Sequence, residues 1–198
     1  MSRGLRILLL VVCSSSLPIS ASAFDGQRQG FVLGGGLGAG LVSFSQEASG
    51  GGLTLETERQ EEPALATEFV IGGGLNETTL LTYSARVSWF SIVNLFDDDV
   101  TVTHALGTVA LTQYARPTVP SFYYTVGVGF STWDLPFEED AGDPWVGLGL
   151  RGGVGYEFRS HFSVEASVGW GEPSTEEGAV DVSSNVISVN VVLVGLAY

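Results

Sequence analysis

The chain has 198 residues with 8 basic and 22 acidic side chains, a formal net charge of −14, 27 glycines and a single cysteine at position 13. So acidic a chain excludes nucleic acid as a partner, because that binding depends on neutralising phosphates with Lys and Arg. One cysteine cannot form a disulfide within the chain, which excludes a small disulfide-stapled scaffold.

The first 23 residues have the pattern of a secretory signal peptide. They contain two arginines near the start, an apolar run over residues 8–12, and the small-residue motif Ala21-Ser22-Ala23. The alternative, a transmembrane anchor, needs about 20 apolar residues, more than this run supplies. We therefore expect cleavage between Ala23 and Phe24, and a mature domain of residues 24–198 with six arginines against 22 acidic residues.

Apolar and polar residues alternate in eight segments of the mature chain, each bounded by turn residues. This alternation predicts β-strands, and each segment reaches the ~9–11 residues that a tilted membrane-spanning strand needs. A helical membrane protein is excluded, because no mature segment has 18 uninterrupted apolar residues. In chain order the predicted strands cover residues 30–45, 65–76, 78–90, 100–115, 121–133, 145–159, 162–171 and 186–198.

The third, fifth, sixth and seventh predicted strands each separate an apolar face from a polar or small one. In the sixth, Val146 and Leu148 alternate with Gly147, Gly149 and Arg151. The fourth and eighth strands alternate less regularly. Val191 and Leu193 are apolar on the face that the pattern assigns as polar, so the facing of these two strands stays open.

Long and short connections also alternate along the chain. The long ones, at 46–64, 91–99, 134–144 and 172–185, contain most of the acidic residues, whereas those at Glu77, Arg116-Pro117 and Ser160-His161 are short. This pattern predicts an all-β fold, an eight-stranded antiparallel up-and-down transmembrane β-barrel with short periplasmic turns and longer acidic extracellular loops. A lipocalin-like barrel with an apolar interior is the alternative, since alternation alone does not say which face points inward.

All four tryptophans lie where a predicted strand meets a long connection, as an interfacial aromatic belt requires. The alternation assigns Trp89 and Trp170 to the lipid side. It assigns Trp133 and Trp145 to the lumen side, so only half of the group fits a belt.

Three features together resemble a known family. They are the mature start from Phe24 into a glycine-rich first strand, the Gly-x-Gly strands, and the terminal Val194-Gly195-Leu196-Ala197-Tyr198. The chain resembles the small outer-membrane β-barrel proteins of OmpA-like and OmpW-like type. The resemblance implies the outer membrane of a Gram-negative bacterium, contact with its lipid and lipopolysaccharide, and recognition of Tyr198 by the barrel-assembly machinery. We expect a monomer.

Five charged residues have lumen parity: Glu68, Arg86, Arg151, Glu157 and Glu165. Eight strands enclose an interior just wide enough for side chains to fill, and charges buried there must pair or meet water. The sequence thus predicts a plugged polar lumen and a non-enzymatic role in envelope integrity or surface interaction. A turn near Glu77 pairs residues whose numbers sum to about 154, which sets Glu68 opposite Arg86.

Two other functions remain as alternatives. One is a narrow OmpW-like passive channel for small apolar solutes. The other is a lipid A-modifying enzyme, because His161-Phe162-Ser163 matches a His-x-Ser pair used by a deacylase family. His161 is predicted at a periplasmic turn, away from the outer leaflet where that chemistry occurs, and His104 is expected to be a lumen or loop residue.

The acidic loop sequences Asp97-Asp98-Asp99 and Glu138-Glu139-Asp140 invite a divalent-cation interpretation. They lack the spaced ligands of a dedicated binding loop, so neither a metal site nor any other cofactor is predicted.

Overall fold

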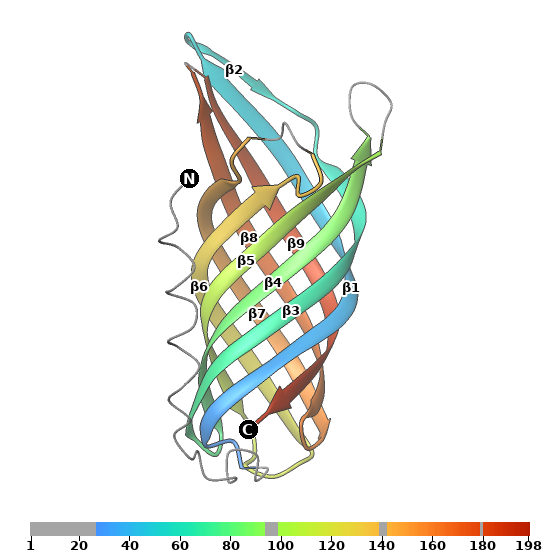
Figure 1. Cartoon of the computed structure of the whole chain (residues 1–198), viewed down its shortest axis with the longest axis vertical. Helices are drawn as coiled ribbons and strands as arrows, with labels where there is room; N and C mark the ends of the chain where they lie inside the picture. The colour runs from blue at the N-terminus through green and yellow to red at the C-terminus, as the bar shows by residue number, and fades with distance from the viewer. Residues whose placement is uncertain (1–26, 94–98, 139–141, 179) are drawn as a thin grey trace, which may run out of the picture.

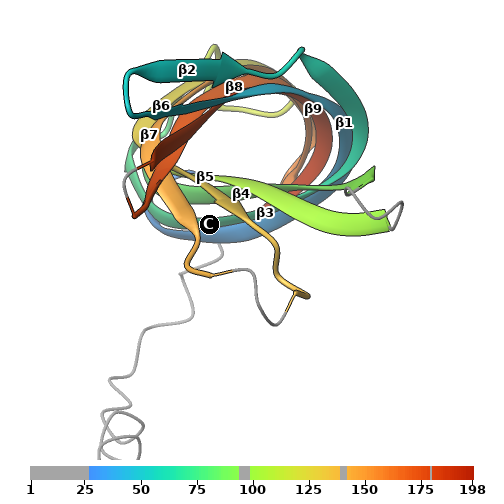
Figure 2. The same ribbon diagram turned by 90° about the horizontal axis from the view of Figure 1, so that it is seen from above.

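The computed structural model describes residues 27–93, 99–138, 142–178 and 180–198. In this part of the chain the strands tilt around a common axis, and β1 pairs with β9 to close a ring (Figure 1). Seen from above, the ring encloses one lumen (Figure 2). The predicted signal peptide and its cleavage site at Ala23-Phe24 lie outside the described residues. No helix in the described ranges is long and apolar enough to cross a membrane.

The predicted eight-stranded antiparallel barrel is confirmed, with one short strand added to it. Every strand pairs antiparallel with its neighbours, and the short β2 pairs only with the upper end of β1. The strands are β1 (Gly30–Gly50), β2 (Leu53–Glu56), β3 (Gln60–Asn76), β4 (Thr79–Val93), β5 (Asp99–Tyr114), β6 (Ser121–Asp134), β7 (Trp145–Arg159), β8 (Phe162–Glu177) and β9 (Val180–Ala197).

Two of the predicted long loops are wrong, because much of residues 46–64 and 172–185 is strand. β1 continues to Gly50 and β8 to Glu177, and both pair there with the start of β9. These extensions are rich in Ser, Gly and Glu and have no apolar face to bury in a membrane. The alternation that marks a membrane-spanning strand therefore stops before the strand itself ends.

Burial alternates along the strands and fixes which face is inside. In β9, Val192 and Val194 are buried inside the barrel, whereas Val191 and Leu193 are each 54 % exposed on the outside. This fixes the facing of β9, which the sequence left open: the face that the pattern assigned as polar is the outer one. The inner face of β9 is partly apolar because Val192 and Val194 pack with Ala66 inside the barrel, so residue type does not separate inside from outside here.

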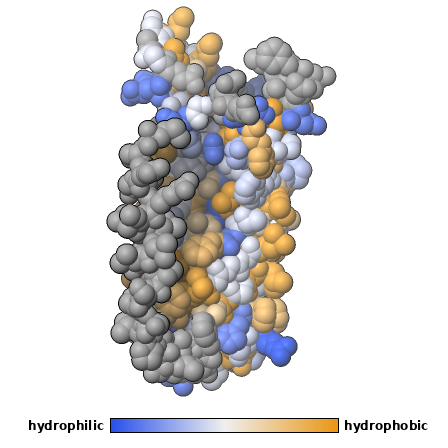
Figure 3. All heavy atoms as spheres, in the orientation of Figure 1, coloured by the Kyte–Doolittle hydropathy of each residue, from blue (hydrophilic) through white to orange (hydrophobic). Residues whose placement is uncertain are grey.

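The outer wall exposes many large apolar side chains, and hydrophilic residues lie at both ends of the visible face (Figure 3). Outward-facing residues of β6 illustrate this: Phe122, Tyr124, Val126 and Phe130 are 46–68 % exposed. Such an exposed band is stable in hydrocarbon and not in water. The lipocalin-like alternative is wrong, because charged side chains occupy the middle of the interior and the apolar wall faces outward.

Candidate functional site in the barrel lumen

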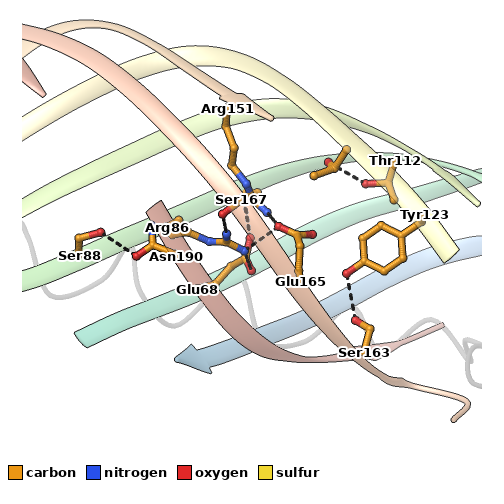
Figure 4. A network of polar contacts seen from close by, with 12 residues as sticks. Glu68, Arg86, Ser88, Thr112, Tyr123, Arg151, Ser163, Glu165, Ser167 and Asn190 are labelled. Atoms are coloured by element: carbon orange, nitrogen blue, oxygen red, sulfur yellow. Dashed lines mark hydrogen bonds and ion pairs between the residues drawn. The ribbon is translucent and has the colours of Figure 1, made fainter. Parts of the chain in front are cut away.

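A cluster of four charged side chains crosses the middle of the lumen. Glu68 on β3 and Arg86 on β4 are directly opposite each other, which confirms the predicted register. Arg151 comes from β7 and Glu165 from β8. In the ring, three strands separate β3 from β7 on either side, and likewise β4 from β8. The cluster therefore joins opposite walls of the barrel (Figure 4).

Each arginine of this central cluster binds both glutamates. Arg86 Nη2 is 2.5 Å from Glu68 Oε2 and 3.0 Å from Glu165 Oε1. Arg151 Nη1 is 2.5 Å from Glu68 Oε1, and Arg151 Nη2 is 2.6 Å from Glu165 Oε1. All four side chains are buried. With two positive and two negative charges the cluster is formally neutral, which offsets much of the cost of removing the charges from water.

Serines complete the coordination of the central cluster. Ser84 Oγ donates to Glu68 Oε1 at 2.9 Å and accepts from Arg151 Nη1 at 2.5 Å. Arg86 Nη1 donates to Ser167 Oγ. These short side chains fit beside the larger charged ones and satisfy further polar atoms, as a buried network requires. Among the described residues, the Nε atoms of Arg86 and Arg151 are buried without a hydrogen-bond partner.

Above the central cluster, aromatic side chains close the extracellular end of the lumen. The ring centroids of Phe44 and Trp133 are 5.0 Å apart, those of Phe90 and Trp133 are 5.5 Å apart, and Trp145 stacks on Trp133 at 6.5 Å. Val42, Val102 and Val186 fill the space around them. This upper plug explains why Trp133 and Trp145 have lumen parity: they pack inside the barrel and do not belong to a lipid-facing belt.

Below the central cluster, a second group of buried residues closes the periplasmic end. This lower plug contains Val32, Leu80, Tyr114, Tyr123 and Tyr198, with the rings of Tyr114 and Tyr123 at 4.9 Å. Between it and the cluster lies a cavity of about 30 Å³. Since a water needs roughly 10–15 Å³ of such volume, the cavity has room for one or two waters and is too small for a solute.

Arg28, which sequence reasoning missed, reaches into the lower plug from the segment before β1. Its side chain is among the largest that are fully buried. Nη1 donates to the carbonyl oxygens of Arg116 at 2.9 Å and Pro117 at 3.1 Å, and the guanidinium lies 3.8 Å above the ring of Tyr114. Nη2 forms an ion pair with Glu157. No local pattern marks this role, because the partners are about 50 to 130 residues away in sequence.

The structure separates Glu157 from the other four predicted lumen charges. Glu157 is buried at the periplasmic end, where it binds Arg28 and accepts a hydrogen bond from the hydroxyl of Tyr198. Tyr198 is 1 % exposed, and its ring packs against that of His161 in a tilted arrangement with the ring centroids 4.8 Å apart. The terminal tyrosine therefore lies inside the barrel and not on its lipid-facing wall.

The two histidines lie at opposite ends of the lumen. His161 sits at the periplasmic turn, with Nδ1 2.8 Å from Leu196 O, whereas Ser163 points into the lumen, 3.1 Å from Tyr123 Oη. Phe162 separates them and faces outward. His104 is buried near the upper plug, with Nε2 2.9 Å from Ser131 Oγ.

The acidic loop sequences are only partly within the described residues. Asp97 and Asp98 lie outside them, as do Glu139 and Asp140. Binding of a divalent cation by these loops therefore stays an interpretation of the sequence. In the part of the chain that the structure does describe, no group of three or more His, Cys, Asp or Glu side chains is arranged to hold a metal ion.

Comparison with known proteins gives one family match and several similar structures. Residues 101–198 match the model of a family described as outer membrane protein beta-barrel domain. No curated protein matches the chain.

Three similar solved structures illustrate the range of matches. The outer membrane protein OprG from Pseudomonas aeruginosa has 13 % identity and a TM-score of 0.48, with 88 % of this chain and 99 % of OprG covered. Neisserial surface protein A has 12 % identity and a TM-score of 0.40, with 78 % of this chain and 96 % of that protein covered. Ail of Yersinia pestis, in complex with the heparin analogue sucrose octasulfate, has 12 % identity and a TM-score of 0.38, with 81 % of this chain and 98 % of Ail covered.

Proposed function

Since this chain belongs to the outer-membrane protein β-barrel family, we propose that it is a non-enzymatic barrel with a closed lumen, which acts in envelope integrity or surface interaction. It resides in the outer membrane of a Gram-negative bacterium as a monomer that contacts lipid and lipopolysaccharide. The barrel-assembly machinery inserts it.

The central cluster is the observation that supports a closed lumen. Four buried charges from opposite walls meet at mid-barrel, with an aromatic plug above and another below. An ion crossing this interior would have to displace ion pairs that have little access to water, which is costly. A channel for small apolar solutes would need an apolar path, and the same four charges interrupt it.

Planar-bilayer recording on the refolded protein tests the closed lumen. We expect no steady conductance from the wild-type barrel. A steady open state of the wild-type protein would contradict the proposal and favour the channel.

The non-enzymatic part of the proposal has its own test. His161 and Ser163 point to different surroundings, one at the turn and the other into the lumen, which does not favour joint catalysis at the lipid face. Mass spectrometry of lipid A from cells with and without the protein should give the same species. A deacylated lipid A that appears only with the protein, and disappears in Ser163→Ala, would contradict this.

A further inference from the structure

A polar groove lies on the outer wall of the strand extensions above the apolar band. It has a volume of about 560 Å³, within the ~300–1,000 Å³ typical of small-molecule sites. We call it the rim groove and use six of its lining residues: Ser45, Glu47, Glu56, Arg59, Glu172 and Asn185. Ser45 and Asn185 are directly paired across β1 and β9, next to Phe44 and Val186, which are buried in the lumen. Because successive side chains alternate, the groove is on the outside.

A chain of hydrogen bonds holds one wall of the rim groove in place. Arg59, between β2 and β3, donates from Nη2 to Asn185 Oδ1 at 2.8 Å and from Nη1 to Ser43 O at 3.2 Å. Asn185 Nδ2 in turn donates to Glu172 Oε1 at 3.4 Å. Four segments, namely β1, the β2–β3 connection, β8 and β9, are thus tied together around the groove, and the guanidinium of Arg59 is directed at the wall.

The charges of the rim groove select against anions. Glu47 and Glu56 are directly paired on β1 and β2, and Glu172 adds a third carboxylate. Arg59 is the one cation among the lining residues. Phosphate, sulfate and uronic acid groups would meet net negative charge here. A metal ion is not favoured either, since none of the described side chains form a group of three suited to one.

Carboxylates, an amide and serine hydroxyls are side chains that can bind the hydroxyls of a sugar, because together they both accept and donate hydrogen bonds. We propose that the rim groove binds a saccharide without negative charge, either neutral or bearing an amine. An amino group would gain an ion pair with Glu47, Glu56 or Glu172. This site is independent of whether the lumen is closed.

Titration calorimetry on the folded barrel, in a detergent that contains no sugar, tests the proposal. The probes are the glucosamine tetramer, maltotetraose and tetragalacturonate. We expect the amino sugar to bind most tightly, maltotetraose more weakly and the anionic tetragalacturonate least. Asn185→Ala and Glu172→Gln should each weaken glucosamine-tetramer binding about tenfold, the effect of losing a hydrogen bond to a charged group.

Glu138→Gln is the matched control, because it removes one exposed extracellular carboxylate away from the groove. It should leave the affinity within about twofold, as expected for a screened charge. Each variant must keep the heat-induced gel shift of a folded barrel. If Asn185→Ala does not fold, Ser183→Leu takes its place, because Ser183 also lines the rim groove and a leucine there would fill it. Absent binding of maltotetraose and the amino sugar, equal binding of all three probes, or an affinity unchanged by the groove variants would overturn the proposal.

The sugar could belong to lipopolysaccharide in the same leaflet or to a soluble glycan, and reconstituted vesicles separate these sources. If lipopolysaccharide supplies it, maltotetraose should bind more weakly in vesicles that contain lipopolysaccharide than in phospholipid vesicles. If the source is soluble, the two affinities should be equal. Either result supports the groove as a saccharide site, provided Asn185→Ala removes the binding measured in phospholipid vesicles.

Discussion

Glu68 and Arg86 stand directly opposite each other on β3 and β4, and the guanidinium of Arg86 also reaches Glu165 on the far wall. One residue pair thus combines a local contact between neighbouring strands with a contact across the lumen. Its energetic weight can be measured by double-mutant cycles, which isolate the interaction of two side chains from their separate effects.

Glu68→Ala should destabilise the barrel by about 3–5 kcal/mol, because it leaves buried positive charge without compensation. In an Arg86→Ala background the same change should cost less, yet not zero, since Arg151 still faces Glu68. Urea unfolding in lipid vesicles measures all four variants. Strictly additive effects would mean that the two side chains do not interact.

Arg28→Ala should also cost about 3–5 kcal/mol, because it leaves Glu157 without its arginine and removes the donors to the Arg116 and Pro117 carbonyls. Arg28→Lys should recover only part of this, since an ammonium lacks the planar fork that serves several acceptors at once. Unfolding midpoints in urea are the readout. Arg159→Ala, at an exposed position, should stay near wild type, and an equally stable Arg28→Ala would exclude a structural role for the residue.

Two glycines of β7 should respond oppositely to alanine. A Cβ on Gly155 would collide with the ring of Tyr123 inside the lower plug, so Gly155→Ala should cost about 1–3 kcal/mol through overpacking. Gly152 faces outward with nothing within 4 Å of a new Cβ, so Gly152→Ala should be neutral or stabilising by up to about 1 kcal/mol. Thermal unfolding of both variants measures the change in stability. Equal effects would mean that the inner face of β7 is not close-packed.

Tyr198→Ser should lower the yield of assembled barrel, whereas Tyr198→Phe should retain most of it. The phenyl ring preserves the packing against His161 and the lower plug, and only the hydrogen bonds of the hydroxyl to Glu157 and the His161 backbone N–H are lost. The fraction of heat-modifiable protein in the outer membrane is the measurement. Secretion to the periplasm, followed by immunoblot, should be unchanged in both. Normal assembly of Tyr198→Ser would contradict a role in recognition by the insertion machinery.

The mature protein isolated from outer membranes should begin at Phe24, because Ala21-Ser22-Ala23 fits signal peptidase. Intact-mass spectrometry of the purified protein gives the answer directly. A chain that retains its first 23 residues would mean that this segment acts as an anchor.

Much of the barrel could be predicted because four strands separate polar from apolar residues clearly. Arg86 on β4 and Arg151 on β7 alternate with large apolar residues, so their lumen side followed from the pattern. The pairing of Glu68 with Arg86 followed from the position of one tight turn. Local alternation and a known turn are enough to fix face and register wherever one face is polar.

The two plugs and the contacts of the buried Arg28 side chain could not be predicted, and the physical reason is the same for both. Val102 and Val186 face the lumen because they pack around Trp133, and an apolar residue packed inside looks the same in sequence as one that faces lipid. Arg28 binds the backbone carbonyls of Glu77 and Arg116, which lie in two different connections, and carbonyl groups carry no sequence signature. Both features depend on contacts between segments far apart in the chain.

The central cluster has a mechanical consequence. Arg151 to Glu68 and Arg86 to Glu165 run along two different diameters of the barrel, and the ion pairs Arg86–Glu68 and Arg151–Glu165 connect the two. Flattening the cross-section into an ellipse would stretch contacts along one diameter while compressing those along another. The ion pairs between these arginines and glutamates thus keep the cross-section of the barrel round under lateral pressure from the surrounding lipid. A barrel braced in this way resists deformation at the level of the central cluster.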